Sequence, residues 1–253
     1  MQRSVYELFP YPSRKIDSRS ELESYGRWAA NAIGIRPLEL AGKSVLEAGC
    51  GTGEAACGLA ILGANVTAFD LSGSSIQKAL ALQEKFKVEN VSFVRADLFA
   101  FETDNRFDIV LSLGVLHHTK DPCGGFSRLV SWAKSGGLVC TGWYNPLGRM
   151  RLRLKRWLVG LFAGADVQKR MAIAKKLFYG GKLPSKGEIH LADKFGQPLE
   201  SYHFVEEVLG WFSKNHLELA HARPALEPHL LWMQLKWFLN KKGAFFVLSG
   251  KKK

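Results

Sequence analysis

Hydrophobic and polar positions follow two different periods along the middle of the chain. Short apolar runs predict buried strands at 44–48, 65–69, 91–95, 107–113 and 137–143. Apolar residues at helical spacing predict helices between them, at 53–62, 73–87 and 122–134. Strands that alternate with helices indicate an α/β fold, with a mostly parallel sheet and helices on both faces.

The flanking segments predict further elements. Ser18 and Glu21 form a capping box for a helix that Gly34 ends, after an arm that contains Pro10 and Pro12. Later helices are expected at 167–179, 205–215 and 226–240, and strands at about 217–222 and at 244–249. The chain therefore divides into an arm and lid helix (1–36), an α/β core (37–144), a helical cap (145–204) and a C-terminal completion of the sheet (205–253).

A glycine-rich turn follows the first predicted strand. Gly49, Gly51 and Gly53 permit a sharp turn and a close approach of the backbone to a ligand. The helix behind the turn points its free amide groups at that ligand. The residues 51–56 fit G-x-G-x-x-A, which alone is weak evidence for a dinucleotide. Glu47 would repel a pyrophosphate at close range, so it favours a cationic ligand.

The segment Glu47–Gly53, E-x-G-C-G-T-G, resembles the first motif of the class I S-adenosylmethionine-dependent methyltransferases. The resemblance implies a Rossmann-like, seven-stranded methyltransferase sheet whose last strand is antiparallel. It also implies that Glu47 and the glycines hold the methionine part of S-adenosylmethionine, that Asp70 binds the ribose, and that Asp97 and Leu98 contact the adenine. The other cofactor contacts that it implies are Cys50, Leu71, Leu113 and His118.

The fourth strand leads to Val115-Leu116-His117-His118-Thr119-Lys120-Asp121-Pro122, which is similar to the V-L-H-H-x-x-D-P of small-molecule members of that family. Methyl transfer needs alignment and, for a protonated acceptor, removal of a proton. His117 and His118 are the candidate bases, because an unperturbed histidine has a pKa of about 6.5. Adjacent residues point in different directions, so we expect at most one to face the substrate. The alternative is that one packs on the adenine or caps the next helix while the other lies at the surface.

Further pocket candidates are scattered over the predicted lid segments: Tyr11, Tyr25, Tyr144, His190, Tyr202 and His203. His190, Asp193 and His203 have a loose metal-ligand spacing, but such spacings are common by accident, and no metal is predicted.

The positive charge is concentrated in one half of the chain. The net charge is +12, residues 1–145 carry 15 basic and 15 acidic side chains, and residues 146–253 carry 20 and 8. A helix after Pro146 places its apolar positions on one side (Leu147, Met150, Leu154, Trp157, Leu158 and Leu161). Its other side carries Arg149, Arg153 and Arg156. Residues 146–186 could contact an anionic membrane or an acidic substrate. Alternatively, the apolar side covers the pocket and the charges are merely solvated. Nucleic acid is disfavoured because no binding module is recognised.

The remaining composition suggests a cytoplasmic protein, with peripheral contact at the inner membrane surface as an option. No apolar run approaches the ~20 residues of a membrane span, and the scattered cysteines suggest reduced thiols. We therefore predict a methyltransferase that acts on O, N or C of a small-molecule or lipid-like metabolite. The alternatives are methylation of RNA or protein by way of the basic cap, and, from another class, a non-catalytic nucleotide-binding module or an NAD-dependent oxidoreductase.

Overall fold

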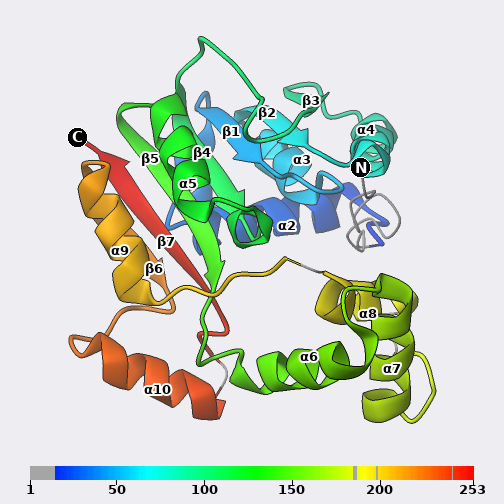
Figure 1. Ribbon diagram of the computed structural model, residues 1–253. Helices are drawn as coiled ribbons and strands as arrows, with labels where there is room; N and C mark the ends of the chain where they lie inside the picture. Colours follow the sequence, from blue (N-terminus) through cyan, green and yellow to red (C-terminus); the bar gives the residue numbers. More distant parts are fainter. Residues whose placement is uncertain (1–14, 185–186, 198, 241) are drawn as a thin grey trace.

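The computed structural model describes residues 15–184, 187–197, 199–240 and 242–253 (Figure 1). A seven-stranded sheet in the order β3-β2-β1-β4-β5-β7-β6 forms its centre. Only β7 runs antiparallel to its neighbours, as predicted for the last strand. The strands are β1 (Ser44–Ala48), β2 (Asn65–Asp70), β3 (Val91–Arg95), β4 (Phe107–Leu113), β5 (Ala133–Tyr144), β6 (Leu217–Arg223) and β7 (Phe245–Lys252).

The first strand lies at the point where the strand order reverses. Val45 pairs with Val66 of β2 on one side and with Ile109 of β4 on the other, both in parallel register. The carboxyl ends of β1, β2 and β4 therefore meet at one edge of the sheet. In sheets of this kind ligands bind beyond that edge, at the reversal.

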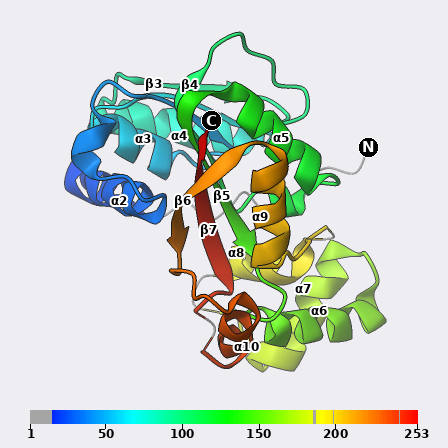
Figure 2. The same cartoon turned by 90° about the vertical axis from the view of Figure 1, so that its left-hand side faces the viewer.

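Helices cover both faces of the sheet (Figures 1 and 2). One apolar layer joins the sheet to α2 (Arg19–Ala32), α3 (Glu54–Ile61) and α4 (Gly73–Phe86). The layer on the other face joins it to α5 (Pro122–Trp132), α9 (Val205–Lys214) and α10 (Leu230–Asn240). Short 3-10 helices lie at η1 (Pro37–Leu40) and η2 (Leu116–His118).

The predicted leading helix is present as α2. The hydroxyl of Ser18 accepts a hydrogen bond from the backbone of Glu21 (3.1 Å), a cap of the kind that stabilises a helix by about 1 kcal/mol. The helix packs directly on α3, since a Cβ added at Gly26 would lie 2.3 Å from the backbone of Gly58. Tyr11 of the predicted arm lies outside the described residues.

The inserted segment forms a separate small cluster of helices at one end of the molecule (Figure 1). It comprises α6 (Met150–Ala163), α7 (Val167–Tyr179), α8 (Gly187–Leu191) and the π-helical turn η3 (Ala192–Gly196).

The orientation of α6 corrects one interpretation of the sequence. Leu154, Trp157 and Leu161 are 58%, 64% and 60% exposed, whereas Arg156 is only 9% exposed. The buried guanidinium of Arg156 donates to the carbonyls of Lys194 (2.7 Å) and Gln197 (2.6 Å). A helix whose apolar side covers the pocket while its charges are solvated is therefore wrong. The backbone carbonyls of Lys194 in η3 and of Gln197 after it hold Arg156 inward instead.

Candidate functional site

The glycine turn leaves β1 in a left-handed backbone conformation at Gly49 (φ 77°), Gly51 (φ 55°) and Gly53 (φ 83°). A Cβ at Gly49 would lie 2.4 Å from Val115, and one at Gly53 would lie 2.7 Å from Ala79. Among the described residues, a Cβ at Gly51 would meet no atom beyond its chain neighbours within 4 Å. The protein's own packing thus requires Gly49 and Gly53, while Gly51 borders open space that a ligand can fill.

Asp70 at the end of β2 holds this turn in place. One carboxylate oxygen accepts from the backbone N–H of Gly51, and the other accepts from that of Ser72, both at 2.9 Å. Asp70, the residue predicted to bind the ribose, is therefore already oriented by hydrogen bonds from the turn that would carry the cofactor. Leu71 beside it is half exposed.

Glu47 at the end of β1 is buried, and its Oε2 has no hydrogen-bond partner within the described residues. Burial, followed by the charges of Glu54 and Asp70, raises its pKa to about 8. At neutral pH the ligand-free side chain is therefore mostly the uncharged acid, and a bound cation or hydrogen-bond donor would favour its carboxylate form. Cys50 is buried beside it and Leu113 is partly buried.

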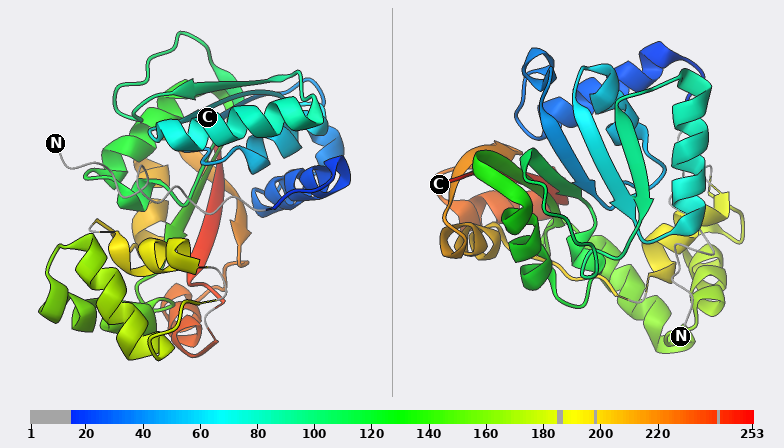
Figure 3. Two further views of the ribbon diagram at one scale, coloured as in Figure 1. Left: turned by 90° about the vertical axis from the view of Figure 1, so that its right-hand side faces the viewer. Right: turned by 90° about the horizontal axis from the view of Figure 1, so that it is seen from above.

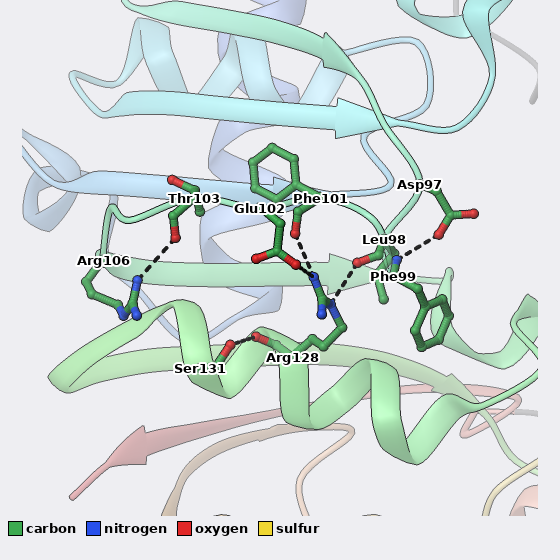
Figure 4. A network of polar contacts seen from close by, with 9 residues as sticks. All are labelled: Asp97, Leu98, Phe99, Phe101, Glu102, Thr103, Arg106, Arg128 and Ser131. Carbon is green, nitrogen blue, oxygen red and sulfur yellow. Dashed lines mark hydrogen bonds and ion pairs between the residues drawn. The ribbon is translucent and has the colours of Figure 1, made fainter.

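The segment after β3 is fixed to α5 by a residue that the sequence analysis did not single out. Arg128 of α5 donates to the carbonyls of Leu98 (3.1 Å) and Phe101 (2.7 Å) and pairs with Glu102 (Figure 4). Asp97 accepts from the N–H of Phe99 (2.7 Å), and Leu98 is 7% exposed. The predicted adenine contacts therefore lie on a braced turn.

The two histidines after β4 occupy different environments. His117 is fully buried, and its ring lies 3.8 Å from that of Tyr144, between ring centroids. Neither of its ring nitrogens has a hydrogen-bond partner within the described residues, and burial holds its pKa well below the usual range. His118 is only partly buried, and its Nδ1 lies 3.0 Å from the carbonyl of Leu199. Burial lowers the pKa of His118 as well.

The contact with Leu199 defines the tautomer of His118. A carbonyl oxygen can only accept, so Nδ1 carries the proton and Nε2 carries the lone pair. His118 is therefore a neutral base near pH 7, and it is the histidine of the pair that lies nearer to solvent. That at most one of the two faces a substrate stays a prediction.

Aromatic rings surround the ends of β4 and β5. Phe245 lies against the end of β5, where a Cβ at Gly142 would be 2.3 Å from its ring. Its centroid is 5.8 Å from that of Tyr144, whose pKa burial raises to about 12. Tyr144 thus stays a neutral phenol in the wall that His117 and His118 complete.

Arg149 connects this wall to the inserted helices, and neither it nor Glu200 was among the predicted site residues. The guanidinium of Arg149 lies 3.4 Å from the ring centroid of Tyr144. The buried carboxylate of Glu200 lies 3.8 Å from Arg149 and 3.3 Å from Arg156. The spacing of Arg149 and Arg156 was visible in the sequence. Their pairing with Glu200, more than 40 residues later in the chain, left no local pattern.

The other predicted pocket residues are spread over the molecule. Tyr25 faces Trp28 on α2 (5.1 Å between centroids), and Tyr202 lies 4.8 Å from the guanidinium of Arg153. His203 is buried, and its two ring nitrogens contact Ser201 (2.8 Å) and Glu207 (2.9 Å).

His190 lies within the insertion, facing Tyr179 at 6.4 Å between ring centroids. In the part of the chain that the structure describes, no three His, Cys, Asp or Glu side chains converge on a possible metal position. The cysteines are free thiols.

Comparison with protein families identifies the chain. The sequence model described as "Methyltransferase domain" matches residues 39–197, which is more than half of the sequence. The chain belongs to this family. As a class I S-adenosylmethionine-dependent methyltransferase it uses S-adenosylmethionine as cofactor, which confirms the prediction from Glu47–Gly53.

The curated relatives of this methyltransferase are distant. An uncharacterised protein of Synechococcus sp. is 27% identical over 210 residues, which cover 78% of this chain and 50% of that protein. The ubiquinone biosynthesis O-methyltransferase of Thiobacillus denitrificans is 37% identical over 138 residues, or 54% of this chain and 52% of that protein. The chain therefore spans about half the length of these relatives.

Solved structures share the fold. The magnesium protoporphyrin IX methyltransferase of Synechocystis PCC 6803, crystallised with bound S-adenosylhomocysteine, superposes with a TM-score of 0.60 at 17% identity. That alignment covers 98% of this chain and 93% of the other.

Two features of the site fit the cofactor of the family. The unpartnered Oε2 of Glu47 suits the ammonium group of the methionine part, and the open space at Gly51 suits a ligand lying over the turn. When bound, the cofactor supplies an electrophilic methyl group. The residues that would hold it are Glu47 at the end of β1, Asp70 at the end of β2, and Asp97 and Leu98 on the braced turn after β3.

A pair of glycine substitutions separates ligand contact from folding. G51A should cost about 1 kcal/mol of stability, from its left-handed backbone, while weakening S-adenosylhomocysteine binding about tenfold by filling the space above the turn. G49A should instead destabilise the fold, because its Cβ collides with Val115. Thermal unfolding and calorimetric titration measure both quantities. A G51A variant with unchanged affinity would place the cofactor away from this turn.

Proposed function

We propose that this methyltransferase methylates an ionisable oxygen of a small, lipid-like molecule. The observation that carries the proposal is the neutral imidazole of His118, which completes a wall of aromatic rings at the ends of β4 and β5. Rings of this kind favour a flat, apolar acceptor. The neutral Nε2 would take the hydroxyl proton as the oxygen attacks the methyl group.

The relatives support a small acceptor. Several curated relatives, including the one from Thiobacillus denitrificans, are named ubiquinone biosynthesis O-methyltransferase. The Synechocystis structure is named magnesium protoporphyrin IX methyltransferase. A nicotinamide oxidoreductase is set aside by the family to which the chain belongs.

RNA or protein as the acceptor is the second candidate, and the positive charge of the C-terminal half is the observation behind it. Two of the arginines in the basic segment are engaged within the protein. Arg156 donates to two backbone carbonyls, and Arg170 donates to those of Phe195 (2.6 Å) and Gly164 (2.8 Å). This pairing favours the small-molecule acceptor.

Peripheral contact of residues 146–186 with an anionic membrane is part of the same proposal, because the outward side of α6 is apolar. No helix among the described residues has the length and apolar character that a membrane crossing requires. A cytoplasmic location stays a prediction.

Transfer of a radiolabelled methyl group tests the acceptor class. The full chain is incubated with methyl-labelled S-adenosylmethionine and a cell extract, which is then separated into organic-soluble, RNA and protein fractions. We expect the label in the organic-soluble fraction, and we expect D70A, which lacks the predicted ribose ligand, to transfer none at the same cofactor concentration. Label in RNA or protein, or no transfer despite tight cofactor binding, would contradict the proposal.

A further inference from the structure

Two helices at one end of the molecule present apolar side chains to solvent. On α6 these are Leu154, Trp157, Leu161 and Phe162, and on α10 they are Leu231, Trp232, Leu235, Phe238 and Leu239, with exposures from 40% to 71%. Both helices lie at the lower end of the molecule, away from α4 and β3, in Figures 1 and 2 and in the left view of Figure 3. Single exposed apolar residues are ordinary, but several on the outward side of one helix indicate an interaction surface. We call these nine residues the apolar end face.

Polar anchors fix which side of each helix turns outward. On α6 the buried Arg156 binds the carbonyls of Lys194 and Gln197. On α10 the buried Gln234 accepts from the side chain of Asn145 (2.7 Å) and from the backbone of Val205 (3.0 Å). Each helix therefore turns a polar anchor inward together with apolar residues, Val159 and Ala163 on α6 and Met233 and Trp237 on α10. The remaining apolar side chains of both helices face solvent.

Exposed cations are carried by α6 and by the rest of the insertion to which it belongs. Arg151 and Lys155 lie on the exposed flank of α6, and Lys169, Lys176 and Lys182 are exposed on the rest of the insertion. From Arg149 to Lys186 the sequence has 11 basic residues and one acid, Asp166. Trp, Leu and Phe beside Lys and Arg are typical of helices that lie in the interface of an anionic bilayer. A second copy of the chain would bring like charges together, and nucleic acid would leave the apolar side chains uncovered.

We infer that α6 and α10 together form a docking face for an anionic phospholipid surface. The inference extends the proposed membrane contact of residues 146–186 to a second helix, and it does not depend on which atom is methylated. An open cavity of about 510 Å³ runs along α6, lined by Leu154 and Trp157 and also by Glu200 and Tyr202. The backbone of Ser201, between those two, donates to the carbonyl of His117 (2.8 Å). The docking face thus adjoins the segment that supports the aromatic wall.

Vesicle binding of the full chain tests the two helices separately. The probes are vesicles of phosphatidylcholine alone and vesicles in which about a third of the lipid is phosphatidylglycerol. The variants are W157S/L161S on α6 and W232S/F238S on α10. The matched control is W28S, which removes a tryptophan 44% exposed on α2. Affinity for S-adenosylhomocysteine and far-UV circular dichroism show that each variant is folded.

We expect the wild-type chain and W28S to sediment with the anionic vesicles, and brominated lipid to quench the tryptophan fluorescence of both. Each double variant should bind these vesicles about tenfold more weakly or worse, with unchanged affinity for S-adenosylhomocysteine. If the wild-type chain binds the anionic vesicles but transfers no methyl group, the proposed function is overturned and the docking inference stands.

Three results would overturn the inference itself. These are absence of binding to anionic vesicles, full binding by W232S/F238S, and a dimer in solution that the same substitutions dissociate.

Discussion

Replacing His118 with Ala is expected to lower kcat for methyl transfer by about 10²- to 10⁴-fold, the usual contribution of a general base. The reason is that Nδ1 donates to the carbonyl of Leu199, so Nε2 is the basic nitrogen of the ring and can accept the proton of the acceptor. Cofactor affinity should change far less, because the methionine and ribose contacts lie at the ends of β1 and β2. The measurement is kcat at saturating cofactor with the acceptor found by label transfer.

The pH profile distinguishes a base from a merely structural residue. Burial lowers the pKa of His118 below 6.5, and the base works in its deprotonated form, so wild-type kcat should rise with pH below 6.5 and level off above it. H118A should lose that rising limb, and added imidazole should restore part of the rate. H216N, at an exposed histidine with φ 56°, is the control, because Asn tolerates that conformation. Should H118A keep the limb while a His117 variant loses it, the base is His117.

The sheet could be read from the sequence because its signals are local. Apolar runs such as 91–95 and 107–113 match β3 and β4 residue for residue, and the resemblance at Glu47–Gly53 correctly supplied the antiparallel last strand. The start of β5 was missed, since it begins at Ala133 and passes through Gly136 (φ 75°) and Gly137, which suggest a turn. A register shift opposite Phe107 and Ile109 accommodates those residues.

The orientation of the outer helices could not be read in the same way. A period of 3.6 residues shows that α6 has two unlike sides, but not which one turns inward. That depends on long-range partners, here the carbonyls of Lys194 and Gln197 and the carboxylate of Glu200. The same holds for α10, whose inward side carries the hydrogen-bonded Gln234 together with Met233 and Trp237. The braces of the site, Arg128 and Arg149, were missed for the same reason.

Replacing Glu47 with Gln is expected to weaken cofactor binding by about 2–5 kcal/mol, the cost of removing one partner of a buried ion pair. The amide would keep the shape of the side chain but lose the charge that the ammonium group requires. Calorimetric titration with S-adenosylmethionine at pH 8 measures the change. An affinity within threefold of wild type, about 0.6 kcal/mol, would show that the ammonium group binds elsewhere.

Because Glu47 titrates within an accessible pH range, we expect cofactor affinity to rise with pH while the stability of the ligand-free protein falls. Its pKa in the ligand-free fold, about 8, lies above the ~4.3 of an unfolded chain, so the folded state holds the proton more tightly. Stability of the ligand-free protein should therefore fall as pH rises from about 5 to about 8, and level off above that range. A cationic cofactor selects the carboxylate, so its binding releases a proton and tightens up to about tenfold per pH unit over the same interval. E47Q should remove both trends, gaining stability at pH 8 while its affinity stays independent of pH. Thermal unfolding and titration across this interval would contradict the assignment if the two quantities changed in the same direction.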